Sequence, residues 1–315
     1  MLTICLPEDC RREREYAADL VFREMLGLDV ELQFQPRGDV VVRGPDGKEV
    51  VLSDQFFPQA AVHWLREASM PSLPLTWLPI EPPLDAGQFC GPSVPVLFGN
   101  PTASRLVECD GPDRFALNVD VLGAVFFLTS RYEELVSPVR DRRGRFPIGA
   151  STGSQAGFID RPLADEYVAL LGALLARQWP GLPLRRHEYR FLLSHDVDTP
   201  YWIYGRGAGS IVFGLAADLL VSRSWQRAKR RVRAAAATCR QGLAADPYNS
   251  FPFIFRMNEQ CGATSAFYFI TKQRAGRLDG THPFDSPLVQ DLLREIHLQG
   301  HEIGVHPSYG SFDHP

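Results

Sequence analysis

The sequence has no long apolar run, no paired cysteine motif and no surplus of positive charge. A membrane-crossing helix needs roughly 18 to 20 apolar residues, and charged residues follow closely on Met1, so we expect neither a span nor a signal peptide. The six cysteines lack metal-type spacing and are too sparse for a disulfide scaffold, which favours a reducing, cytoplasmic compartment. A net charge of -4 gives no overall case for nucleic acid.

The 315 residues are enough for two domains with separate cores, and the composition is typical of globular proteins. We predict an α/β protein with an N-terminal α/β domain over residues 1–186 and a second domain over residues 187–315. The boundary is expected at Pro180–Arg186, where Pro-Gly-Leu-Pro follows a predicted helix.

Periodicity predicts the elements of the first domain. The expected strands are Leu2–Leu6, Val30–Phe34, Asp39–Arg43 and Glu49–Leu52. The expected helices are Asp9–Leu26, with Tyr16, Leu20, Val21 and Phe22 on its inner side, Val119–Leu135, and Pro162–Trp179 with Asp160 as its cap. The proline-rich segment Pro71–Pro101 is expected to be extended rather than regular.

The stretch Phe191–Pro200, reading FLLSHDVDTP, is the most informative part of the chain. Its first three residues have the apolar character of a buried strand, and acids follow where that strand would end. Asp196 and Asp198 stand two apart, so in an extended segment they point the same way and could share one cation. The alternative is a pair of acids that only leads into a turn before Pro200.

A second segment ends in a histidine. Ser286 and Pro287 are typical of a helix start, and apolar residues then recur on one face until Gly300. The short strand that follows presents His306 at its end. A carboxylate and an imidazole at the ends of two parallel strands are suitable ligands for a catalytic divalent metal.

These residues together resemble the polysaccharide deacetylase family, which has the nodulation-type deacetylase domain. The resemblance rests on the acids of His195-Asp196-Val197-Asp198, on Gly300-His301-Glu302-Ile303-Gly304, and on a strand at 262–270 between them. It implies the first part of a (β/α) barrel, with Asp196 as general base and Asp198 and His306 as ligands of a divalent metal, for which zinc is the expected ion. It also implies hydrolysis of the amide of N-acetylated amino sugars in a glycan substrate.

The chain also departs from the family pattern. The family commonly has a second histidine four residues after the first, where this chain has Gly310; His314 and Asp313 are the nearby substitutes. The sequence provides only about the first three strands of such a barrel, and the family's later motifs are absent. We therefore expect self-association or another chain that completes the barrel. A catalytically inactive carbohydrate-binding or assembly protein with the same fold is the competing hypothesis.

Three neighbouring residues are supporting candidates: His195, Ser308 and Tyr309. His195 is expected either to orient Asp196 or touch the metal, or to be a buried histidine bonded to nearby backbone. Ser308 and Tyr309 follow His306 directly.

Residues 201–245 are expected to be a helical insertion between the first and second barrel strands. Its apolar first part and arginine-rich second part fit an amphipathic arm on an anionic membrane surface, through residues 205–240. The alternatives are a solvated helical arm and a lid over the site.

The first domain has its own motif. Phe-Phe-Leu-Thr-Ser-Arg-Tyr-Glu-Glu, followed by Arg-Phe-Pro, resembles the uncharacterised N-terminal domain that precedes one bacterial subgroup of deacetylases. Within it, Arg131, Glu133 and Glu134 are expected either to contact a sugar or the neighbouring domain, or to be the solvated end of a helix.

Overall fold

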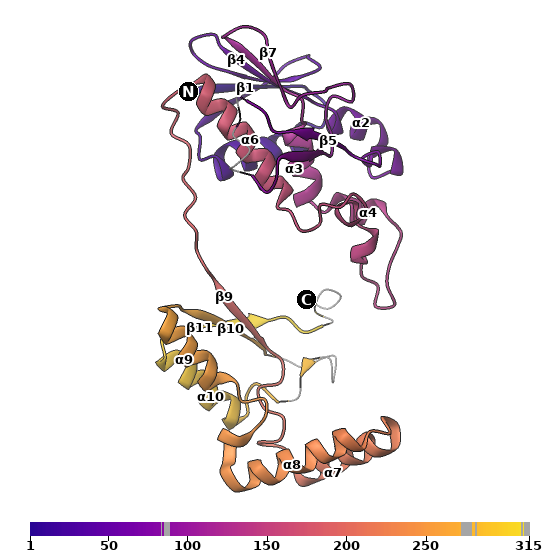
Figure 1. The fold of residues 1–315 in the computed structure, drawn as a ribbon, viewed down its shortest axis with the longest axis vertical. Helices are drawn as coiled ribbons and strands as arrows, with labels where there is room; N and C mark the ends of the chain where they lie inside the picture. The colour runs from indigo at the N-terminus through magenta and orange to yellow at the C-terminus, as the bar shows by residue number, and fades with distance from the viewer. Residues whose placement is uncertain (83, 85–88, 272–278, 281, 310, 312–315) are drawn as a thin grey trace. The chain divides into compact units, whose positions relative to one another are not determined.

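A computed structural model of the chain describes residues 1–82, 84, 89–271, 279–280, 282–309 and 311. The chain divides into two compact units, which we call the N-terminal unit (residues 1–187) and the C-terminal unit (residues 188–315). Figure 1 shows that each unit combines helices with a sheet, and the expected α/β class is confirmed. The strands of the described residues form open sheets, and no closed barrel is present among them.

A six-stranded mixed sheet, in the order β2-β1-β3-β4-β8-β7, forms the centre of the N-terminal unit. Its strands are β1 (Leu2–Leu6), β2 (Val30–Phe34), β3 (Val40–Arg43), β4 (Glu49–Leu52), β7 (Val107–Cys109) and β8 (Arg114–Leu117). The four predicted strands are confirmed. The pairs β1/β2 and β4/β8 are parallel, and the remaining neighbours are antiparallel.

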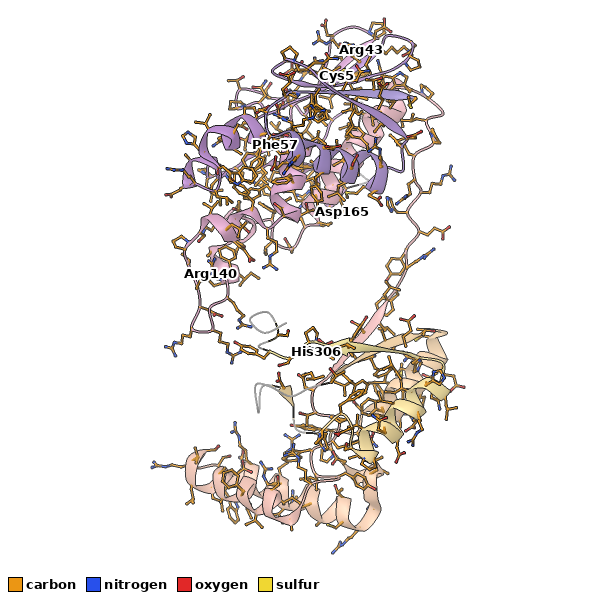
Figure 2. The ribbon with its side chains drawn as sticks, turned by 180° about the vertical axis from the view of Figure 1, so that it is seen from behind. Cys5, Arg43, Phe57, Arg140, Asp165 and His306 are labelled. Carbon is orange, nitrogen blue, oxygen red and sulfur yellow. The ribbon has the colours of Figure 1, made fainter. Side chains whose placement is uncertain are left out.

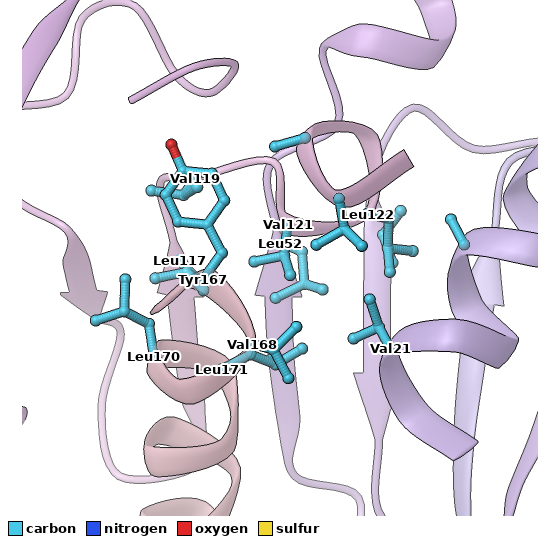
Figure 3. Packing of buried hydrophobic residues seen from close by; sticks show 14 of the residues in the cluster. Val21, Leu52, Leu117, Val119, Val121, Leu122, Tyr167, Val168, Leu170 and Leu171 are labelled. Carbon is cyan, nitrogen blue, oxygen red and sulfur yellow. The ribbon is translucent and has the colours of Figure 1, made fainter. Parts of the chain in front are cut away.

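Helical segments complete this unit, and several of them contribute residues to the larger core. They are α1 (Arg11–Ala18), π-helical η1 (Asp19–Met25), α2 (Phe56–His63), η2 (Glu67–Ser69), α3 (Val121–Thr129), α4 (Tyr132–Val136), η4 (Ile148–Ala150), α5 (Thr152–Gln155) and α6 (Leu163–Gln178). Apolar residues recur through α6 at helical spacing, and its Val168 and Leu171 face Leu52 and Leu117 of the sheet (Figure 3).

The first predicted helix differs from the structure in two respects. It begins at Arg11, because Cys10 has a φ of 46° in the left-handed region, and it becomes π-helical from Asp19. Val21 and Phe22 are buried as expected, but Tyr16 is 50% exposed, so its expected inward position was wrong. Its ring lies on the rim of the core, edge-on to Phe126.

Two other helix predictions needed correction. The helix expected over 119–135 breaks into α3 and α4 because Arg131 has a φ of 54°, which a continuing α-helix does not allow. The helix α6 begins at Leu163 with Pro162 at its N-cap position and no side-chain cap. The predicted cap by Asp160 was therefore wrong, since this residue lies two positions too early. The proline-rich segment is more regular than expected, because β5 (Thr76–Pro79) pairs with β6 (Ser93–Val96).

A buried ion pair fixes the first helix of the N-terminal unit to the sheet. Arg14 has no exposed side-chain surface, and its guanidinium donates two hydrogen bonds of 2.8 Å to the oxygens of Asp54, whose side chain is 1% exposed. It also donates to Asp9 and lies over the ring of Phe57. The buried charge is thus compensated by two carboxylates, of which Asp54 is itself buried and Asp9 is partly exposed.

A three-stranded parallel sheet, in the order β11-β10-β9, forms the centre of the C-terminal unit. The strands are β9 (Leu193–Val197), β10 (Ser265–Ile270) and β11 (Glu302–His306). Phe267 and Phe269 of β10 face α9 (Phe251–Cys261) and α10 (Pro287–Leu298), and together they make the smaller core. Ser286 caps α10, as its position in the sequence predicts.

The first strand of this unit lies later in the chain than expected. Pairing begins at Leu193 opposite Ser265, the first residue of β10, so earlier residues have no partner strand there. Phe191 and Leu192 are 65% and 86% exposed, and their expected burial was wrong. Asp196 lies within β9, and Asp198 directly follows it.

The insertion is helical, as expected. It consists of α7 (Ala208–Ala216), π-helical η5 (Ala217–Val221), α8 (Trp225–Gln241) and η6 (Gly242–Ala245). The carboxylate of Asp246 holds its two ends together, because it accepts hydrogen bonds from the backbone N–H groups of Trp202, Ile203, Tyr204 and Tyr248. The backbone segments at the start and at the end of the insertion are thus bound to the same carboxylate.

Candidate functional site

Asp196 and His306 meet at the carboxyl end of the parallel sheet. Asp196 pairs with Tyr268, and Tyr268 pairs with Gly304, two residues before His306. Because alternate residues of a strand share a face, all these positions lie on the face opposite to the phenylalanine core. His306 Nε2 lies 3.7 Å from Asp196 Oδ2, and their side chains are 31% and 64% exposed. Figure 2 shows His306 where β11 ends. The pair is accessible to a solute.

The backbone determines which nitrogen of His306 is available. Its Nδ1 lies 2.7 Å from the carbonyl oxygen of Pro307. A carbonyl oxygen only accepts, so Nδ1 carries a hydrogen, and whenever the ring is neutral Nε2 is the nitrogen that presents a lone pair. That lone pair is at the nitrogen nearest to Asp196. The same arrangement orients histidines that bind metals in other proteins.

This pair fits two positions of a divalent metal site. Two ligands of one tetrahedral zinc, an imidazole nitrogen and a carboxylate oxygen, stand about 3.4 Å apart given zinc bonds of about 2.1 Å. The observed 3.7 Å is close to this value. Among the described residues no group of three or more His, Cys, Asp and Glu side chains forms a metal cluster. The residues therefore fit the ion in part. Gly310, Asp313 and His314, the region of the expected third ligand, lie outside the described residues.

Asp198 is exposed, and its backbone lies against Gly280. Gly280 has a φ of 85°, and a Cβ there would lie 1.8 Å from the carbonyl oxygen of Asp198. Only glycine permits both the backbone conformation and this approach. The segment of Gly280 therefore fixes the backbone immediately after β9.

Sequence reasoning missed Asp279, which lies next to Gly280 and connects it with the segment that follows β11. Its side chain is buried, at 1% residue exposure, and accepts hydrogen bonds from Ser308 Oγ at 2.8 Å and from Tyr309 N at 2.7 Å. The supporting candidates Ser308 and Tyr309 are thus held by Asp279, at the sheet edge where Asp196 and His306 meet. The Asp-Gly dipeptide at 279–280 is a turn signal that could have identified it.

Tyr268 was also missed as a candidate for this face of the sheet. A Cβ at position 304 would lie 2.5 Å from two carbon atoms of the Tyr268 ring. The ring therefore lies over Gly304, beside Asp196 in the sheet register. An aromatic side chain next to an acid and a histidine is a suitable surface for an organic ligand.

His195 lies on the other face of the sheet. Its ring stacks on Phe267 with centroids 4.8 Å apart, and its Nε2 is 3.3 Å from Ser265 Oγ. Asn258 donates to the same hydroxyl and also approaches His301. Burial, and secondarily the nearby His301, lowers the pKa of His195. The structure thus places His195 in a polar network beneath the sheet, away from the Asp196 and His306 pair.

The acidic motif of the N-terminal unit has local partners. Glu133 Oε2 accepts a hydrogen bond of 2.7 Å from Thr152 N, and Arg131 pairs with Glu134 on the surface. These contacts join α4 to the short helix α5. These local contacts favour the hypothesis that Arg131, Glu133 and Glu134 form the end of a helix over the hypothesis that they bind a sugar.

The protein is thus a two-unit α/β protein, and its candidate site lies at the carboxyl end of the parallel sheet, where Asp196 and His306 meet. The chain belongs to DUF7033, a family of unknown function, whose model matches residues 2–180. The match covers the N-terminal unit and ends before β9. No curated protein and no solved structure matches the chain.

Proposed function

We propose that the C-terminal unit acts in the metal-dependent deacetylation of N-acetylated amino sugars in a glycan. The observation that carries the proposal is the pair of Asp196 and His306, 3.7 Å apart at the carboxyl ends of β9 and β11. Two further features support it: the resemblance of the strand-end motifs to polysaccharide deacetylases, and the ring of Tyr268 on the same face.

In this reaction the oxygen of a water adds to the acyl carbon, the carbon–nitrogen bond breaks, and the amine takes a proton. When bound, a divalent ion such as zinc would polarise the amide carbonyl and make the water more acidic. His306 would hold this ion through Nε2, whose lone pair is fixed by the Nδ1 bond to Pro307. A carboxylate beside it would accept the proton of the water.

The roles of the two aspartates can be assigned in two ways. The family resemblance implies Asp196 as base and Asp198 as ligand. The short distance to His306 instead favours Asp196 as the second ligand, with Asp198 as the base. Both assignments use the same three residues, and metal binding by single variants separates them.

The experiment measures bound metal by elemental analysis after incubation with zinc and desalting. We expect His306→Ala to lose most of the bound zinc, while His297→Ala, a matched change on the exposed side of α10, keeps it. Zinc bound equally by the wild type and His306→Ala would refute the proposed site. Acetate release from N-acetylated oligosaccharides then tests the reaction itself.

A catalytically inactive protein that binds carbohydrate is the second candidate. Gly310, where the resemblance implies a second histidine, favours it. Such a protein would bind N-acetylated oligosaccharides without releasing acetate, and its binding would survive His306→Ala.

We further propose a reducing, cytoplasmic location, supported by six cysteines that are all unpaired in the structure. Among the helices of the described residues, none is long and apolar enough to cross a bilayer.

A further inference from the structure

The insertion forms a pair of adjacent helices with a short connection. α7 and η5 run out, and α8 returns beside them (Figure 1). Arg231 of α8 donates a 2.7 Å hydrogen bond to Asp218, and these side chains are only 16% and 10% exposed. Arg231 also lies against Gly214, where a Cβ would be 2.6 Å from its guanidinium. We call this structure, residues 205–245, the helical arm.

The helical arm is strongly basic, although the whole chain is acidic. It contains eight Lys and Arg residues and one acid, Asp218, while the chain has a net charge of -4. The single acid is already paired with Arg231. Arg223, Arg227 and Lys229, close to the connection between the helices, are exposed. The arm therefore presents a concentrated positive charge to a partner.

The same connection exposes large apolar side chains. Leu220, Val221 and Trp225 are 77%, 81% and 71% exposed, and Val212 of α7 is 64% exposed. α7 contains no charged residue. Leu220, Val221 and Trp225 lie within six residues of the chain. Exposed apolar side chains of this size that lie close together are more typical of an interaction site than of a solvated helix. The eight residues 220–227 contain three large apolar side chains and two arginines.

We propose that the helical arm is a docking surface for an anionic lipid bilayer. Leu220, Val221 and Trp225 enter the boundary between headgroups and acyl chains, and Arg223 and Arg227 contact the lipid phosphates. Tryptophan is enriched at this depth because its ring is apolar and its N–H group is polar. Binding is peripheral, and it does not depend on the deacetylase proposal.

A bilayer explains both kinds of side chain. A nucleic acid would engage the arginines through phosphate but would leave Leu220 and Val221 in water. An acidic protein surface would also match the charge, but it offers no apolar layer beneath that charge. These two partners are therefore outcomes that the experiment must separate from lipid.

The experiment is co-sedimentation of the full chain with vesicles of phosphatidylcholine, alone or mixed with phosphatidylserine. We expect binding to the mixed vesicles only, weakened by salt. A triple variant that combines Arg223→Gln, Arg227→Gln and Lys229→Gln should bind about a hundredfold more weakly, since each basic residue at an anionic surface contributes about a factor of five. A double variant that combines Leu220→Ser and Val221→Ser should weaken binding by at least about tenfold.

The matched control removes three exposed charges from the N-terminal unit. This control variant combines Arg105→Gln, Arg142→Gln and Arg143→Gln. It changes the net charge by the same amount as the triple variant of the arm and should bind vesicles like the wild type. Circular dichroism confirms that each variant keeps its helices. The proposal is overturned if the arm variant binds as well as this control, or if wild-type chain ignores the mixed vesicles. Retention by single-stranded RNA or polyglutamate without vesicle binding would also overturn it.

Discussion

His306 Nε2 lies 3.7 Å from Asp196 Oδ2, although 110 residues separate them in the chain. The contact exists because β9 and β11 are both parallel to β10, which brings their carboxyl ends to one edge. We therefore expect Asp196→Asn to separate the two role assignments. If Asp196 is the base, zinc stays bound and acetate release falls by at least about a hundredfold. If Asp196 is a ligand, zinc is lost as well, and Asp198→Asn is the variant that keeps zinc without turnover.

Gly280→Ala should destabilise the C-terminal unit and displace Asp198. A Cβ there would lie 1.8 Å from the Asp198 carbonyl oxygen, and the φ of 85° is unfavourable for alanine. Gly300→Ala is the matched control, because Gly300 has a similar φ of 79° but nothing within 4 Å. Chemical denaturation should show a larger loss for Gly280→Ala than the approximately 1 kcal/mol of backbone strain alone. If the two variants lost equal unfolding free energy, the backbone at Asp198 would be able to move away from the new Cβ at no cost.

Asp54→Ala should cost the N-terminal unit about 3 to 5 kcal/mol of unfolding free energy, because it leaves the guanidinium of Arg14 buried with one carboxylate fewer. Asp19→Ala removes the acid of an exposed ion pair with Arg23, and should cost less than about 1 kcal/mol. Urea unfolding measures both changes. Similar losses for the two variants would contradict the assigned importance of burial.

Asp246 should make the helical arm sensitive to acid. Burial by itself raises the pKa of Asp246, but the hydrogen bonds from four backbone N–H groups outweigh it and leave the pKa below its usual value. Since the folded pKa is lowered, the stabilisation is complete above the unfolded pKa of about 3.9 and is lost as pH falls through the folded value.

Asp246→Asn tests this pH dependence. At neutral pH it should lower stability by about 1 to 3 kcal/mol, because the amide NH₂ group faces backbone donors. The difference from wild type should shrink below about pH 4. Hydrogen exchange at the amides of residues 202–204, measured against pH, provides the test. A difference between the two proteins that does not change with pH would rule out titration of this carboxylate.

Residues 1–186 should fold without the rest of the chain. The larger core is built entirely from residues before this boundary, and the structure divides the chain at residue 187. Circular dichroism and thermal unfolding of that fragment should show a single cooperative transition. A fragment that is insoluble or melts without cooperativity would contradict the proposed boundary.

Local sequence determined much of this protein. Short runs rich in apolar and β-branched residues specified β1 to β4, and Ser286 with Pro287 specified the start of α10, because these signals act over a few residues. The strand-end motifs likewise indicated Asp196, Asp198 and His306. What local sequence could not supply was the register, which decides where a strand begins. Phe191 and Leu192 were expected in β9, yet they are exposed because β10 offers no partner before Ser265.

Only the tertiary structure decided which residues meet. It placed His195 beneath the sheet and its neighbour Asp196 above it, because adjacent residues of a strand point to opposite faces. It also brought Asp279 to Ser308, a contact across 29 residues that no local pattern encodes. Arg131 and Cys10, with positive φ, end or begin helices where periodicity predicted continuity. Such backbone angles are selected by packing between elements, and the sequence around them gives no comparable signal.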